Sequence, residues 1–174
     1  MNRKKIFSLL ALLFIIVCDM TTKEQAKEYL QSSQTADLDY PYGGYGIFQG
    51  FLGFIDLSLG YVENQGAAFG ILSQHPMILM GIRIAVIALL LFSLVTKNRS
   101  FNHALPLILI TGGAVGNIID MVRYHYVIDF INIHFDRFSF PLFNIADASI
   151  SCGAAYLIIT EIVSHRFKKN KVTN

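Results

Sequence analysis

Long apolar runs separated by short polar stretches make up most of the chain. A bilayer is crossed by about 20 apolar residues, or somewhat fewer when the polar side chains at the ends reach the headgroups. We predict four membrane-spanning helices, over residues 6–22, 76–96, 104–119 and 145–163. In this interpretation residues 23–75 and 120–144 are outer loops, and residues 1–174 form a single membrane domain.

The first outer loop contains three shorter patterns. The stretch KEQAKEYL, which begins at Lys23, is predicted to continue the first helix beyond the membrane. Further on, YPYGGYGIFQGFLGF is rich in aromatic residues and glycine, which is typical of turns at the level of the lipid headgroups. The stretch IDLSLGYVEN alternates apolar and polar residues, and this alternation predicts a half-exposed β-strand.

The composition also indicates a membrane protein. Hydrophobic residues make up 53% of the chain and charged residues only 15%, which is too apolar for an ordinary soluble domain. Cys18 and Cys152 both lie in apolar runs, so we expect neither a disulfide framework nor a thiolate metal site. His125 and His134 are isolated, and the sequence contains no nucleotide-binding loop and no repeat. We therefore expect no metal, no cofactor and no nucleic acid partner.

The charged residues are sorted between the two sides of the predicted spans. Nine of the fourteen Lys and Arg lie in the N-terminal segment, the link after residue 96 and the C-terminal tail. Eleven of the twelve acidic residues lie on the other side or at its membrane edge, and Glu161 is the exception. Because cytoplasmic segments are enriched in Lys and Arg, we predict that both termini are cytoplasmic.

The N-terminus has an alternative interpretation as a cleaved secretory or lipoprotein signal. It combines RKK, a short apolar core and Cys18. However, the bulky Val17 precedes the cysteine where a small residue is expected, and no small-residue cleavage site follows. An uncleaved first helix also fits the even number of spans.

The conspicuous polar residues gather at the outer edge of the predicted membrane. Asp120 ends the third span, Asp147 begins the fourth, and Asp129 lies on the connection between them. Asp19 and Lys23 leave the first span at the same edge, four residues apart and so on one helix face. A carboxylate at the rim of a membrane indicates a functional site by default.

Each of these residues also has a purely structural interpretation. Asp19 and Lys23 could form an ion pair at a helix end. Asn117 and Asp120, three residues apart on one face, could hydrogen-bond between helices. Asp147 could be stabilised by the positive end of a helix dipole.

Two features lie within the predicted spans. Gly112 and Gly116 form a G-x-x-x-G pattern, which we interpret as the site of a close helix–helix approach. Arg83 is separated from Lys97 by thirteen residues, or about 20 Å of helix, which is short of a hydrocarbon core of about 30 Å. Arg83 therefore lies in the outer part of the membrane, where it either extends toward the headgroups or pairs with one of the acids.

Five short motifs resemble the motif blocks of the lipoprotein signal peptidases (signal peptidase II), in the order found in that family. They are DMTTK, YVENQGAAFGIL, GGAVGNIID, YVIDF and FNIADASIS, between residues 19 and 153. The resemblance implies an all-α polytopic membrane protein with four transmembrane helices, a small periplasmic β-sheet between about Tyr40 and Phe69, and a short amphipathic periplasmic helix. It also implies an aspartic endopeptidase of the bacterial inner membrane.

The resemblance assigns roles to particular residues. It implies that Asp129 and Asp147 are the catalytic pair. The supporting and substrate-binding residues that it implies are Asp19, Lys23, Asn64, Gly66, Ala67, Asn117, Asp120 and Asn144. The implied substrates are diacylglyceryl-modified prolipoproteins, cut just before the lipobox cysteine, and the site faces the periplasm. We expect a monomer that contacts only substrate and membrane lipid.

Two positions depart from the family pattern. Met121 replaces the arginine that usually follows the aspartate of GNxxD, and Met20 replaces a glutamine. We expect the missing arginine to weaken the order around Asp120, and we hypothesise that Arg123 or Arg83 takes over its charge.

A pair of buried carboxyl groups suits peptide hydrolysis, because like charges keep one of them protonated while the other activates water. Two other functions fit the sequence less well than peptide hydrolysis. An ion carrier would spread its acids across the membrane or show repeats, and a non-catalytic lipoprotein-binding paralogue is favoured only by Met121.

Overall fold

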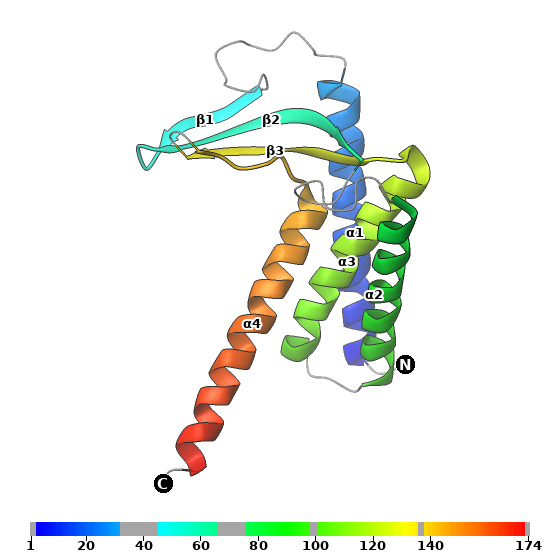
Figure 1. Cartoon of the computed structure of the whole chain (residues 1–174), viewed down its shortest axis with the longest axis vertical. Helices are drawn as coiled ribbons and strands as arrows, with labels where there is room; N and C mark the ends of the chain where they lie inside the picture. Colours follow the sequence, from blue (N-terminus) through cyan, green and yellow to red (C-terminus); the bar gives the residue numbers. More distant parts are fainter. Residues whose placement is uncertain (1–2, 32–44, 66–75, 98–100, 136–137, 173–174) are drawn as a thin grey trace.

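The structure, a computed structural model, describes residues 3–31, 45–65, 76–97, 101–135 and 138–172. Four helices lie side by side, and an antiparallel sheet covers one end of them (Figure 1). Both chain termini lie at the opposite end (Figure 1).

The helices contain the four predicted apolar segments. They are α1 (Arg3–Leu30), α2 (Pro76–Thr96), α3 (Phe101–Tyr124) and α4 (Ile145–Val172). In the described part of the chain, three helical stretches are long and apolar enough to cross a membrane: Arg3–Leu30, His103–Tyr124 and Ile145–Val163. The apolar stretch Met80–Thr96 of α2 is shorter, so the count of four spans stays a prediction, as does the orientation.

Helix α1 continues eight residues past the predicted end of the first span, as the KEQAKEYL pattern predicted. Its outer part is anchored by buried side chains. Ala26 packs against Ile128 and Phe130 of the sheet in a small hydrophobic core. Lys23 is also buried, at 1% exposure, so this end of α1 is held by both apolar and polar contacts.

Glycines allow the helix backbones to approach one another closely. A methyl group on Gly113 of α3 would collide with the backbone carbonyl of Ala146 in α4. The predicted G-x-x-x-G pair faces α1 instead, since a methyl on Gly112 would press on Ile15 and one on Gly116 would collide with the carboxylate of Asp19. These contacts bring the polar residues of three helices together.

The sheet has four antiparallel strands in the order β1-β2-β3-β4. The strands are β1 (Tyr45–Phe51), β2 (Ile55–Asn64), β3 (Val127–Phe135) and the short β4 (Phe138–Ser139). The predicted strand IDLSLGYVEN is confirmed as β2. The prediction of a turn-rich segment is wrong for Tyr45–Phe51, which pairs with β2, although its register is interrupted twice.

The sequence patterns did not predict β3 and β4, which lie in the second outer loop. The resemblance placed a sheet only between Tyr40 and Phe69. The described residues contain no separate amphipathic helix beside the sheet, and the segments 32–44 and 66–75, to which that prediction could apply, lie outside them.

The turn from α3 into β3 fixes the position of the central strand. His125 has a φ of 66°, a left-handed conformation uncommon for a residue with a side chain. It reverses the chain so that the backbone amide of Ile128 donates to Asp120 Oδ2 at 3.2 Å. The start of β3 is thereby tied to the last turns of α3.

Candidate active site

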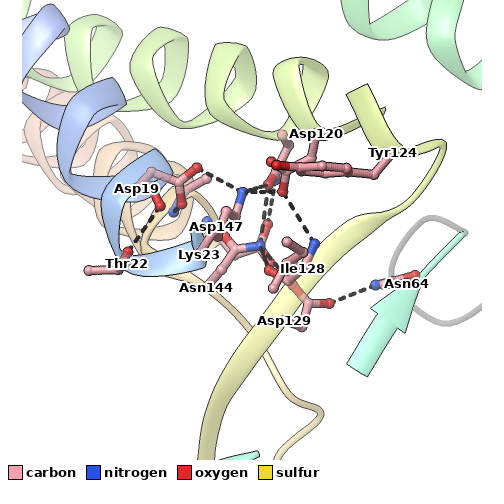
Figure 2. Close-up of polar contacts among 12 residues, drawn as sticks. Asp19, Thr22, Lys23, Asn64, Asp120, Tyr124, Ile128, Asp129, Asn144 and Asp147 are labelled. Carbon is pink, nitrogen blue, oxygen red and sulfur yellow. Dashed lines mark hydrogen bonds and ion pairs between the residues drawn. The ribbon is translucent and has the colours of Figure 1, made fainter. Parts of the chain in front are cut away.

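Asp129 and Asp147 come from two elements that meet at one end of the sheet. Asp129 lies near the start of β3 and is 2% exposed, whereas Asp147 lies in the first turn of α4. The segment before α4 is tied to β3 through Phe143, whose backbone amide donates to Ile131 O and whose carbonyl accepts from Ile131 N, at 3.1 and 2.8 Å. This bridge brings the start of α4 close to the strand (Figure 2).

Two asparagines connect the aspartates through a continuous set of hydrogen bonds. Asn144 Nδ2 donates to Asp129 Oδ1 at 2.7 Å and to Asn117 Oδ1 at 3.3 Å. Asn117 Nδ2 in turn donates to Asp147 Oδ1 at 2.8 Å. Asn144 Oδ1 accepts from the backbone amide of Asp147, also at 2.8 Å, and so caps the first turn of α4.

The second oxygen of Asp129 is held by β2. Asn64 Nδ2 donates to Asp129 Oδ2 at 2.9 Å (Figure 2). The backbone register explains this contact, because Asn64 pairs with Val127 and Val62 pairs with Asp129 on the adjacent strand. Both oxygens of Asp129 thus accept a hydrogen bond from an amide side chain.

The opposing effects of burial and hydrogen bonding decide the acidity of Asp129. Burial disfavours its charged form and raises the pKa of the carboxyl group to about 6. This value already includes a smaller increase from the charge of Asp147 and the decreases caused by the donors Asn64 and Asn144 and by the charge of Lys23. Asp129 can therefore hold a proton in mildly acidic solution, unlike an exposed aspartic acid.

Lys23 forms a buried ion cluster beside the two aspartates. Its Nζ lies 2.7 Å from Asp19 Oδ2 and 3.0 Å from Asp120 Oδ2, and it donates to Asn117 Oδ1 at 2.9 Å (Figure 2). Asp19 also accepts from the backbone amide of Ala146 at 2.8 Å. The predicted ion pair of Asp19 and Lys23 is confirmed, and it contacts the asparagine that holds Asp147.

Asp120 is held by other groups than an arginine at position 121. It is 2% exposed, and its Oδ2 is bound by Lys23 and by the amide of Ile128. The weaker order expected from Met121 stays a prediction, since both donors bind the same carboxylate oxygen.

Three other predicted residues have no described contact with this network. Gly66 and Ala67 lie outside the described residues. Arg123 is exposed, and its guanidinium lies 5.1 Å from the ring centre of Tyr124. Among the described side chains, no group of three His, Cys, Asp or Glu could hold a metal ion.

Some contributors to the site could not be found from sequence. The backbone amides of Ile128 and Ala146 bind Asp120 and Asp19, and backbone groups leave no mark in a sequence pattern. Tyr124, which donates to Glu24 at 2.9 Å between α3 and α1, was also missed. The pair joins residues one hundred positions apart, so no local spacing could indicate it.

Comparison with known proteins agrees with the motif resemblance. The family model described as signal peptidase (SPase) II matches residues 11–163. A lipoprotein signal peptidase of Caldanaerobacter subterraneus subsp. tengcongensis is 38% identical over 83% of this chain and 88% of its own length. That of Chlamydia felis is 34% identical over 91% of this chain and 93% of its own length.

Solved structures share the architecture. Two structures of bacterial membrane enzymes superpose with TM-scores of 0.70 and 0.64, at 26% and 28% sequence identity. The first covers 91% of this chain and 89% of its own, and the second covers 88% and 91%. Together with the long apolar helices, this likeness identifies a membrane protein.

Proposed function

The chain belongs to the signal peptidase II family, and from this membership we propose that it is an aspartic endopeptidase acting on diacylglyceryl-modified prolipoproteins. The cut falls just before the lipobox cysteine and releases the signal peptide. The observation that carries the aspartic mechanism is the amide-bridged pair of Asp129 and Asp147, in which burial raises the pKa of Asp129 to about 6.

In the proposed reaction Asp147 is the ionised partner and Asp129 the protonated one. Asp147 accepts from Asn117 and lies in the first turn of α4, where the helix dipole favours negative charge. It takes a proton from a water molecule, whose oxygen bonds to the scissile carbonyl carbon. Asp129 donates a hydrogen bond to the carbonyl oxygen as negative charge develops there.

The resulting tetrahedral intermediate collapses when the carbon–nitrogen bond breaks. The leaving nitrogen receives the proton that Asp147 took from water, so a free amine and a carboxyl group form. No covalent bond to the protein is needed. The asparagine bridge supports this reaction by holding the two carboxyl groups in fixed relative positions, which reduces the reorganisation required during the proton transfers.

The place of the site suits a substrate that stays partly in lipid. Asp129 lies in the sheet and Asp147 begins an apolar helix, so the pair lies at the boundary between the two parts of the fold. A signal peptide and two acyl chains can remain in the bilayer while the peptide bond is presented there, and each buried CH₂ contributes about 0.8 kcal/mol. We place the chain in the bacterial inner membrane as a monomer, with cytoplasmic termini and the site at the periplasmic face.

The non-catalytic alternative has little support from the structure. Its basis was Met121, yet Asp120 is bound by Lys23 without an arginine at that position. The ion-carrier alternative is also disfavoured, because Asp19, Asp120, Asp129 and Asp147 are joined through Lys23, Asn117 and Asn144 in one cluster (Figure 2).

The test is cleavage of a purified diacylglyceryl-modified prolipoprotein in detergent, followed as a gel shift. We expect the wild type to cut, and Asp129→Asn and Asp147→Asn to lose activity while remaining folded. Glu161→Gln is a matched control, since it removes a carboxylate on α4 about 21 Å along the helix from Asp147. Cleavage by either aspartate variant at the wild-type rate would refute the dyad.

A further inference from the structure

Arg83 is the single charged residue of α2. It lies two turns from the start of the helix, within an otherwise apolar stretch. Its Nη1 is buried and has no hydrogen-bond partner among the residues that the structure describes. A buried charged donor without an acceptor is unfavourable, so the position calls for an acceptor that the described residues do not supply.

Asp147 is the charge that acts on Arg83 in the structure. The two groups attract each other electrostatically, although the described contacts include no ion pair between them. The guanidinium is therefore near enough to Asp147 to feel its charge but is not paired with it. A group of the substrate that reaches the proposed site can supply the acceptor for Nη1.

The neighbours of Arg83 limit the chemistry of that group. Ile82 and Ile84, which flank it on α2, are 50% and 52% exposed, as expected for side chains that face lipid. A ligand that reaches the guanidinium along this surface must be apolar and must carry an acceptor oxygen. An ester carbonyl of a diacylglyceryl group has both properties, because it joins an acyl chain to the polar glycerol.

We propose that Arg83 donates a hydrogen bond from Nη1 to an ester carbonyl of the diacylglyceryl group and thereby determines the preference for lipid-modified substrate. This inference rests on the proposed function and adds a specificity-determining residue to it. Arg83 binds the lipid part of the substrate and takes no part in the proton transfers.

The test compares two substrates that differ only at the carbonyl. One prolipoprotein peptide carries a diacylglyceryl group, and the other carries a dialkylglyceryl group, in which ether links replace the esters. For the wild type we expect kcat/KM to be about 10- to 100-fold higher with the ester, the usual effect of a charge-assisted hydrogen bond. Arg83→Met is expected to lose activity on the ester alone, which makes the two substrates equivalent.

Other outcomes overturn the proposal. Equal cleavage of ester and ether by the wild type would do so. The proposal would also be wrong if Arg83→Met lost the same activity on both substrates and showed a shifted pH profile. That result would mean that Arg83 acts through Asp147. If Arg83→Met does not fold, Arg83→Lys keeps the charge but not the planar fork, and an unchanged ester preference in it would count against the proposal. A wild type that cleaves neither substrate would instead refute the proposed function.

Discussion

Asn144 Nδ2 lies 2.7 Å from Asp129 Oδ1, which is the shortest of its three contacts. The amide has two hydrogens, and the other acceptors within reach are Asn117 Oδ1 and the carbonyl of Ile128. A carboxylate is the strongest of the three acceptors, so ionisation of Asp129 tightens its hold on Asn144. The bridge between the aspartates therefore responds to their protonation.

Replacing Asn144 by aspartate tests this bridge. Asn144→Asp keeps the shape but removes the donor and adds a third carboxyl group to the pair. We expect kcat to fall about 100-fold, the scale of a lost acid–base function. Steady-state cleavage of the lipid-modified substrate measures this, with thermal unfolding in detergent as the check on folding. Full activity in a folded Asn144→Asp protein would show that the bridge is dispensable.

The pKa of Asp129 predicts a pH dependence. A raised pKa means that the free enzyme keeps the proton of the pair below about pH 6 and loses it as the pH rises above that value. Since the proposed mechanism needs this proton, kcat/KM is expected to decline on the alkaline side with an apparent pKa near 6. Asn64 lowers the pKa by donating to Asp129, so Asn64→Ala should move the decline to higher pH.

The control for Asn64→Ala is Glu63→Gln on the same strand. Glu63 accepts from Tyr61 and Gln31 and does not contact Asp129 in the described structure. Its replacement is expected to leave the alkaline limb in place. A shift to lower pH in Asn64→Ala would contradict the assignment of Asp129 as the protonated partner.

Lys23 is expected to be essential for stability. Lys23→Met leaves Asp19 and Asp120 buried without their cation, a change that costs about 3–5 kcal/mol. Lys27→Met is the matched control one turn away, where the lysine lies 3.8 Å from the ring centre of Tyr124 and contributes about 0.5–1 kcal/mol. Thermal unfolding of both variants in one detergent measures the difference, and equal losses would mean that the ion cluster is unimportant.

The glycine contacts between helices predict a graded effect of added methyl groups. Gly113→Ala is expected to cost about 1–3 kcal/mol and to reduce cleavage, because its methyl meets the backbone of Ala146 next to Asp147. Gly112→Ala meets only the side chain of Ile15, so a smaller loss is expected. Gly81→Ala meets no atom of the described residues within 4 Å and serves as the neutral control. An unaffected Gly113→Ala would show that α4 can shift without consequence.

The helices could be predicted from the sequence because a helix that crosses the lipid needs a long apolar run. The run in 145–163, for example, lies within the helix that carries Asp147. The strand β2 could be predicted because one of its faces is more buried than the other, so that apolar and polar residues alternate along it. In β3 the first four residues are all buried, and alternation is limited to the later stretch INIHF, in which the polar residues Asn132 and His134 are the buried ones. Its pairing with β2 is a long-range property that local pattern cannot reveal.

The sequence predicted which residues form the site but not which hydrogen bonds and ion pairs join them. Carboxylates at the rim of apolar runs are rare enough to attract attention, which identified Asp19 and Asp129. That Lys23 binds Asp19, Asp120 and Asn117 together depends on how three helices pack, and no spacing along the chain encodes it. The glycines of α3 gave the clearest indication that such packing was close.

The close contact between Gly113 and Ala146 holds the start of α4 against α3, so the two ends of α4 differ in how tightly they are packed. The first three turns pack closely on α3, since a methyl on Gly153 would also press on the carbonyl of Pro106. Further along, Ile158 and Ile159 are 60% exposed each, and the C-terminal end of α4 extends past the other helices (Figure 1). We expect a change in bilayer thickness to be taken up by a tilt of this far part, because it has few contacts with the other helices. The separation of the two aspartates, which depends on the first turn of α4, is then expected to vary little with the lipid composition of the membrane.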